Sequence, residues 1–241
     1  MEFRRFVLND EPCIIHYPEK PNGFGILVIG NRHEFVPRSG EHYWQRNETR
    51  RKILTQLLAD GYTVYFSNLL GQHMGNEEAV ERAGDLYEYV KRTEILNDKI
   101  HIIAEELGAK IAIGFLKRHE DNVRSILFVN PVFSLQWMAE LLEEQPFLYR
   151  RFLQDIAKAY QFEEEDSEIL IHTEQVEQIG KSHPFKIIHI LIHGMYDEKW
   201  VKMYKKYLPA ALAKLHVVLQ EKNQDIVKIA RELFKETEKN L

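Results

Sequence analysis

Residues 100–112 read IHIIAEELGAKIA, a β-branched run that meets Ala-Glu-Glu-Leu-Gly and then changes to a helical pattern. In many enzymes such a strand-to-helix corner carries a nucleophilic serine. The corner needs small residues two positions before and after its central residue, because helix and strand pass close there. Ala104 and Gly108 meet this need, and Glu106 is the central residue. The stretch therefore predicts either the corner of an active site that carries a glutamate or an ordinary turn between a strand and a helix.

Strand and helix patterns alternate along most of the chain. Continuous apolar runs are typical of buried strands, and the amphipathic segments between them are typical of helices. Because parallel strands need crossover helices, this order predicts an α/β fold: a mostly parallel, twisted sheet of about eight strands with helices on both faces. An Asn-Asp-Glu-Pro turn near the start predicts an antiparallel hairpin. The expected strands are 2–8, 12–18, 25–30, 62–68, 99–104, 123–130, 186–192 and 214–220, and the expected helices are 43–59, 77–93, 107–119, 198–208 and one from about residue 224.

Residues 132–185 interrupt this alternation. The segment contains helical patterns around 135–144, 147–160 and 172–180 and no convincing strand, while the acidic run EEED at 163–166 is typical of a solvated loop. Its apolar helical faces indicate either a cover over a pocket or simple packing on the body of the protein. We expect a helical lid inserted into one core domain formed by residues 1–131 and 186–241.

Composition excludes several classes of protein. Hydrophobic residues make up 44% of the 241 residues and charged residues 29%, which is typical of a globular chain with an apolar core. The formal net charge is −5, so the chain lacks the excess of positive charge that is typical of proteins that bind nucleic acid or an anionic membrane. The single cysteine, Cys13, allows no internal disulfide, and the first residues lack the apolar region of a signal peptide. We therefore expect a cytoplasmic protein that binds neither nucleic acid nor membrane.

Polar side chains gather in the loops that follow the expected parallel strands. Ligands of open parallel sheets bind beyond the carboxyl ends of the strands, so these loops are where chemistry is expected. No two of their possible ligands have the spacing of a common metal motif, and their glycines form no dinucleotide or phosphate-binding signature. We therefore expect no metal and no cofactor. The residues in these loops are Arg32, His33, Glu34, His42, His73, Glu106, Asn130, Asp197 and Glu198.

Five motifs together resemble the α/β-hydrolase superfamily, and they occur in its order. GILVIGNRHE (25–34) resembles the strand that leads into the oxyanion loop, and LADGYTVYFSNLLGQHMGN (58–76) resembles the next strand and its loop. AEELG (104–108) stands where the nucleophile elbow is expected. LFVNP (127–131) resembles the following strand end, and ILIHGMYDEKW (190–200) resembles the strand and loop that supply the acid. The resemblance spans nearly the whole chain and implies the same fold, with 132–185 as the lid.

The resemblance also implies where a catalytic triad would stand. Glu106 takes the position of the nucleophile and Asp197 that of the acid, but residues 220–225, where the base is expected, contain no histidine. His33 or His73 is the candidate for a recruited base. The expected binding residues are Asn31, Arg32 and Asn130 at the strand ends, and Leu107, whose backbone N–H lies at the start of a helix.

Two functions remain open from the sequence. The first is a non-catalytic protein of this fold that binds a small molecule or a protein partner in the former active-site pocket. The second is a divergent carboxylic-ester or thioester hydrolase that uses Glu106 and Asp197 with a recruited histidine. We prefer the first, because the two-step ester cycle needs an imidazole to activate water and none follows the last strand. The sequence names no substrate and no protein partner.

Overall fold

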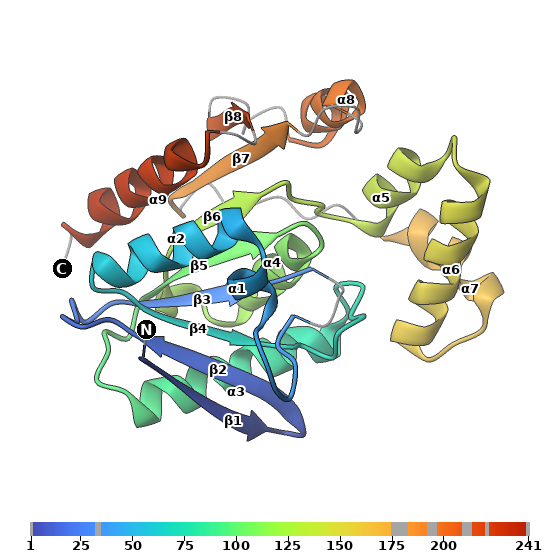
Figure 1. Cartoon of the computed structure of the whole chain (residues 1–241). Coiled ribbons are helices and arrows are strands. Elements are labelled where there is room, and N and C mark those ends of the chain that lie inside the picture. The colour runs from blue at the N-terminus through green and yellow to red at the C-terminus, as the bar shows by residue number, and fades with distance from the viewer. Residues whose placement is uncertain are drawn as a thin grey trace.

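The computed structural model describes residues 2–31, 35–174, 183–191, 197–208, 214–219 and 222–239. Figure 1 shows a sheet flanked by helices, with a separate group of helices at one end. The strands are β1 (Glu2–Leu8), β2 (Glu11–Tyr17), β3 (Gly25–Ile29), β4 (Thr63–Ser67), β5 (Ile100–Glu105), β6 (Val123–Val129), β7 (Phe185–Leu191) and β8 (Leu215–Leu219). The helices are α1 (Tyr43–Arg46), α2 (Glu48–Ala59), α3 (Glu77–Thr93), α4 (Gly108–Arg118), α5 (Leu135–Leu142), α6 (Pro146–Tyr160), α7 (Glu164–Thr173), α8 (Asp197–Tyr207) and α9 (Asn223–Glu238), with a short 3₁₀ turn at Glu120–Asn122.

In the described residues the strands form one eight-stranded sheet in the order β1-β2-β4-β3-β5-β6-β7-β8. β2 pairs antiparallel with both β1 and β4, and every pairing from β4 to β8 is parallel. β5 lies between β3 and β6, so that Ala104 is opposite Ile29 on one side and Phe128 on the other. The predicted hairpin, the mostly parallel sheet and its number of strands are confirmed.

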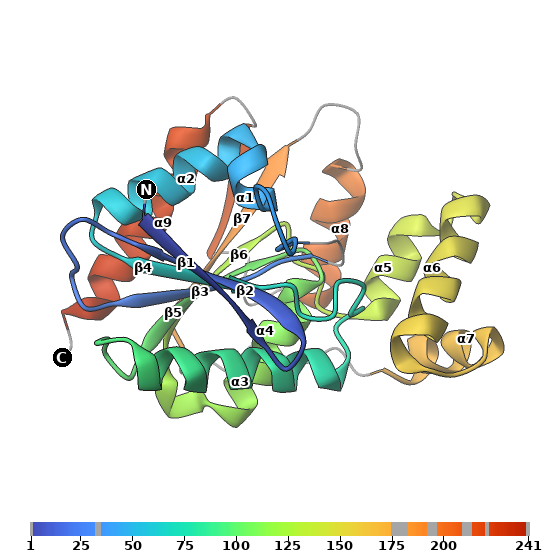
Figure 2. The ribbon, with the colours of Figure 1, turned by 60° about the horizontal axis from the view of Figure 1, so that its bottom comes forward.

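Helices cover both faces of the sheet, as predicted (Figure 2). Alternate residues of the central strands enter two separate apolar clusters, because successive side chains of a strand point to opposite faces. Ile29 and Ala104 pack in the cluster that includes α3 and α4, whereas Val28 and Ile103 pack in the cluster that includes α2 and α9. Both clusters consist of buried residues, so β5 is held between two cores and the position of its carboxyl end is fixed.

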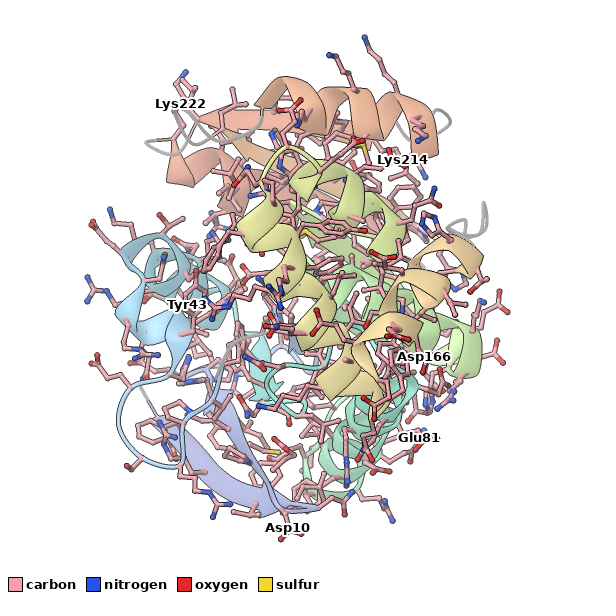
Figure 3. All side chains as sticks on the ribbon, turned by 90° about the vertical axis from the view of Figure 1, so that its right-hand side faces the viewer. Asp10, Tyr43, Glu81, Asp166, Lys214 and Lys222 are labelled. Carbon is pink, nitrogen blue, oxygen red and sulfur yellow. The ribbon has the colours of Figure 1, made fainter. Side chains whose placement is uncertain are left out.

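Helices α5, α6 and α7 lie between β6 and β7 in the chain and beyond the carboxyl ends of the parallel strands (Figures 1 and 3). This helical insertion coincides with the segment expected to be a lid, and its role as a lid stays a prediction. Among the described residues, no helix combines the length and apolar character that crossing a membrane requires.

Two local predictions were wrong. The acidic run 163–166 is not a solvated loop, because Glu164, Glu165 and Asp166 form the first turn of α7, where negative side chains favour the positive end of the helix. The expected helix 43–59 is broken at Asn47, whose extended backbone separates α1 from α2 and whose side chain caps α2 by accepting the N–H of Arg50. The helical pattern expected around 172–180 ends at Thr173 in α7, and residues 175–182 lie outside the described part of the chain.

Candidate functional site

Glu106 occupies a strained corner between β5 and α4. Its φ of +47° lies in the left-handed region, which costs a residue with a side chain about 1 kcal/mol. The backbone N–H of Glu106 donates to the carbonyl of Val129 at 3.0 Å, and its carbonyl accepts the N–H of Val132 at 2.9 Å. These two bonds tie the corner to the end of β6. The side chain of Glu106 is consequently exposed at the carboxyl edge of the sheet.

Small residues on either side allow this corner to form. A methyl group on Gly108 would lie 2.5 Å from the carbonyl oxygen of Ile29 and 2.6 Å from that of Gly30, so the first turn of α4 passes directly against the end of β3. Ala104 is fully buried at the matching position of β5. The close approach that the sequence predicted from these two residues is therefore present.

The end of β3 supplies a second polar group at the corner. Asn31 follows β3, and its Nδ2 donates a hydrogen bond to Oε2 of Glu106. The side-chain oxygen of Asn31 is buried and accepts no hydrogen bond within the described residues. Leu107 buries its side chain, and its N–H has no backbone acceptor in the described part of the chain. The corner thus offers a carboxylate acceptor beside an amide and a backbone donor.

A buried ion pair lies directly behind the corner. Glu105 is 4% exposed; its Oε1 accepts a hydrogen bond from Nε of Arg50, and its Oε2 lies 3.4 Å from the indole nitrogen of Trp44. Burial opposes the charge of Arg50, but the carboxylate of Glu105 and the phenol of Tyr43 outweigh it and raise the pKa of the guanidinium. This pair anchors α1 and α2 to the end of β5.

The phenol of Tyr43 also belongs to this site. Burial raises the pKa of Tyr43, and the carboxylates of Glu105 and Glu106 raise it further. Tyr43 is 37% exposed at the same edge of the molecule as the helical insertion (Figure 3). We define the elbow site as Asn31, Tyr43, Arg50, Glu105 and Glu106. The sequence singled out Asn31 and Glu106 but missed the other three residues, and the only signal for them was an acidic residue at the end of a buried strand.

Other predicted site residues have structural surroundings. Asn130 adopts a left-handed φ of +45°, its side-chain oxygen accepts the N–H of Ile190 at 2.7 Å, and its N–H donates to Ile188 at 2.8 Å. Asn130 therefore joins β6 to β7. His73 is buried, and its Nδ1 accepts the N–H of Gly75 at 3.0 Å, which shapes the loop before α3. Its role as a recruited base stays a prediction.

Several solved structures have an architecture similar to that of this chain. Est1E from Butyrivibrio proteoclasticus superposes with a TM-score of 0.63 at 12% sequence identity over 98% of each chain. The chain has the α/β-hydrolase fold. A proline iminopeptidase of Mycobacterium smegmatis is also similar, with a TM-score of 0.58 at 11% identity over 98% of each chain. A carboxylesterase of Nitrososphaera gargenis gives a TM-score of 0.57 at 12% identity over 99% of this chain and all of the other. No protein-family model and no curated protein sequence matches the chain.

The structure describes only some of the residues that the sequence predicted as the acid and the base. Asp197 is the first residue of α8, but its side chain lies outside the described part of the structure, as do Arg32, His33 and Glu34. His216 is the second residue of β8 and so stands away from the carboxyl end of that strand. Among the described residues, no three His, Cys, Asp or Glu side chains gather as a metal site. The roles of Asp197, Arg32 and His33 remain predictions.

Proposed function

We propose that this protein is a non-catalytic member of the α/β-hydrolase fold that binds a small molecule at the elbow site. One observation supports the proposal: Glu106 stands at a strained, exposed corner between β5 and α4, and hydrolases of this fold carry their nucleophile on a corner of this type. A carboxylate at this corner has no hydroxyl to acylate. The segment 220–225 after the last strand contains no histidine to activate water.

The polar groups of the corner restrict which hydrogen-bonding groups a ligand can carry. The carboxylate of Glu106 accepts hydrogen bonds, and the Leu107 N–H at the start of α4 is a donor beside it. The ligand that fits both groups carries a donor and an acceptor on neighbouring atoms, as an amide does. Asn31 orients the carboxylate, because it holds one of its two oxygens.

The test is turnover of short acyl esters and acyl thioesters by the full chain, with Glu106→Gln as the matched variant. We expect no turnover above the buffer rate for either protein. Turnover by the original chain that disappears in Glu106→Gln would overturn the proposal, because the amide keeps the shape of the side chain but removes its charge and one of its two acceptor oxygens. A thermal-shift screen of amides against both proteins would then identify ligands, since a ligand of this site should stabilise the original chain and not the variant.

A divergent ester or thioester hydrolase is the second candidate. The exposure of Glu106 favours it, because a carboxylate sealed from solvent could not act on a substrate. Glu106 and Asp197 would then act with His33 or His73 as the recruited base. Under this candidate, Glu106→Gln should abolish turnover, and so should either His33→Gln or His73→Gln, whichever histidine serves as the base.

A further inference from the structure

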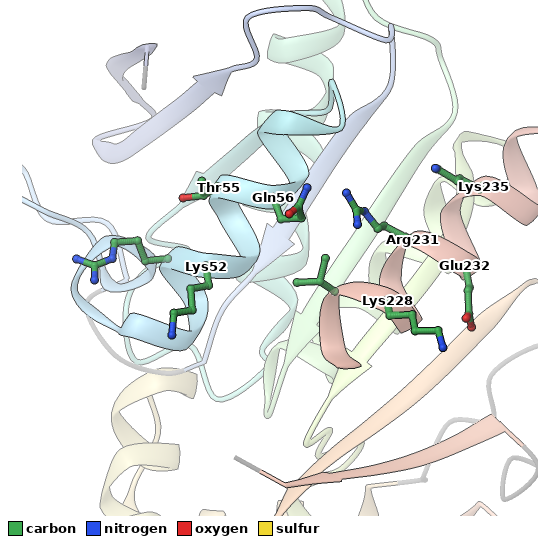
Figure 4. A pocket seen from close by; sticks show the side chains of 9 residues that line it. Lys52, Thr55, Gln56, Lys228, Arg231, Glu232 and Lys235 are labelled. Carbon is green, nitrogen blue, oxygen red and sulfur yellow. The ribbon is translucent and has the colours of Figure 1, made fainter. Parts of the chain in front are cut away.

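A hollow lined by positively charged side chains lies between α2 and α9 (Figure 4). These two helices cover the opposite face of the sheet from α3 and α4 (Figure 2). Its volume is about 740 Å³, which is within the range of sites for small organic ligands. We call it the basic groove. Its charged lining residues in the described part of the chain are five cations, Arg51, Lys52, Lys228, Arg231 and Lys235, and one carboxylate, Glu232.

Three of the six charges are already neutralised. Arg231 holds the carboxylate of Asp60 with two hydrogen bonds of 2.5 Å, and Lys52 lies 2.7 Å from Glu48. The carboxylate of Glu232 is likewise paired, at 3.2 Å, with Lys186. The local structure therefore already accounts for these residues.

The other three cations that line the groove are not paired in this way. Arg51, Lys228 and Lys235 form no ion pair with any residue that the structure describes, and all three are exposed. The chain as a whole carries a net charge of −5, so a general excess of basic residues does not account for their gathering. Their charges are therefore available to an anion that enters the groove.

The spacing of the cations favours more than one anionic group. Lys228 and Lys235 are seven residues apart on one face of α9, which separates them by about 10 Å along the helix. Arg51 stands on the opposite wall, where Thr55 and Gln56 add neutral hydrogen-bonding groups (Figure 4). A single phosphate is too small to contact both walls and both turns of α9. We propose that the basic groove binds a small soluble molecule that carries two or more phosphate groups.

A soluble ligand fits better than an extended polyanion. The cations line a hollow between two helices instead of a flat face, and the net negative charge of the chain repels an anionic membrane or a nucleic acid at longer range. The groove lies on a face of the sheet, whereas Glu106 stands at its carboxyl edge. The proposal is therefore independent of the function proposed for the elbow site.

The test is isothermal titration of the full chain at low ionic strength with inorganic pyrophosphate and with ATP. We expect a Kd in the micromolar range for both, about tenfold weaker binding of inorganic phosphate, and a loss of affinity as salt is added. The variant Lys228→Gln/Lys235→Gln should weaken pyrophosphate binding about tenfold. The variant Glu106→Gln should bind it as the original chain does.

The control is Lys99→Gln/Lys222→Gln, which removes the same charge from two exposed lysines that do not line the groove. This control should bind pyrophosphate within about twofold of the original chain, because the contact at the groove outweighs the long-range field. No heat of binding with either probe would overturn the proposal. An equal loss of affinity in the two double variants would overturn it as well, since binding would then depend on net charge alone.

Discussion

Gly108 is the residue on which the elbow depends most directly. Replacing it with alanine puts a methyl group 2.5 Å from the backbone carbonyl oxygen of Ile29, which cannot rotate away. We expect Gly108→Ala to lower the free energy of unfolding by about 1–3 kcal/mol, measured by urea denaturation. Gly114→Ala in the same helix is the control, because its methyl group meets only the side chain of Val80, which can move. An equal loss in the two variants would contradict the close approach of α4 to β3.

The strain at Glu106 gives a second prediction at a single residue. Glycine adopts a positive φ without the steric cost that any side chain meets there. Glu106→Gly should therefore be about 1 kcal/mol more stable than Glu106→Ala, although neither variant keeps the hydrogen bond with Asn31. Equal stabilities in urea denaturation would show that the corner relaxes once the glutamate is removed. Comparing the two variants with each other cancels the effect of losing the carboxylate.

At the scale of elements, a partly buried lysine attaches the helical insertion to the core. Nζ of Lys110 on α4 contacts the hydroxyl of Tyr160 at 2.7 Å and the carboxylate of Glu174, just after α7, also at 2.7 Å. It also donates to the carbonyl of Gly75 at 2.9 Å, and the second oxygen of Glu174 accepts the N–H of Leu135. One cation thus joins α4, the loop before α3 and all three helices of the insertion.

Breaking this attachment should be costly, because either single change leaves a largely desolvated charge without its partner. We expect Lys110→Met and Glu174→Gln each to lower the free energy of unfolding by about 2–4 kcal/mol. The double variant should lose less than the sum, by about 1–3 kcal/mol. Lys199→Met is the control: its 2.8 Å pair with Glu144 also links core and insertion but is exposed, so it should shift the urea midpoint less. Additive effects at Lys110 and Glu174 would contradict the pairing.

The central strands were predicted correctly because buried strands are rich in apolar residues, which can be recognised in the sequence. β3, β4, β5 and β6 are buried along their whole length; β3 appears as an unbroken apolar run, and the other three strands have apolar residues at most of their positions. The break at Asn47 was missed because the amphipathic pattern continues across it, while the change of direction depends on caps supplied by His42 and Asn47. The acidic run in the first turn of α7 was predicted to be a loop because acidic residues suit both a solvated loop and a helix N-terminus.

Only some residues of the elbow site could be predicted from the sequence, because only some of its contacts are local. Ala104, Glu106 and Gly108 are neighbours in sequence, so local spacing gives their geometry. Arg50 reaches Glu105 across 55 positions of the chain, through the packing of α2 on the sheet. Periodicity shows that a helix has a buried face but not which strand end its charged residues will reach.

At the scale of the whole molecule, a buried histidine pair connects the antiparallel edge of the sheet to α1. Nε2 of His16 on β2 lies 2.8 Å from Nε2 of His42, and both side chains are fully buried. Nδ1 of His42 accepts the N–H of Trp44, so the proton of neutral His42 must be on Nε2, where it donates to His16. His16 then carries its proton on Nδ1. A further proton on His16 would set two N–H groups against each other, and one on His42 would remove the cap of α1.

This arrangement makes the stability of the protein fall in mild acid. Burial is the main cause that lowers the pKa of His16 from 6.5 to about 4 and that of His42 from 6.5 to about 3, and the neighbouring charges of His16, Arg5 and Arg46 contribute to the low pKa of His42. Because the unfolded chain takes up protons from pH 6.5 downward and the folded chain does not, stability is fully present above pH 6.5 and is lost as pH falls toward 3.

His42→Asn keeps a side chain that caps α1 but removes one titrating ring. Its unfolding free energy should therefore fall less between pH 7.5 and pH 4.5 than that of the original chain, whereas His172→Asn, at an exposed histidine of α7, should follow the original chain. Parallel pH profiles for His42→Asn and the original chain would show that carboxylates, and not this pair, set the acid limit of the fold.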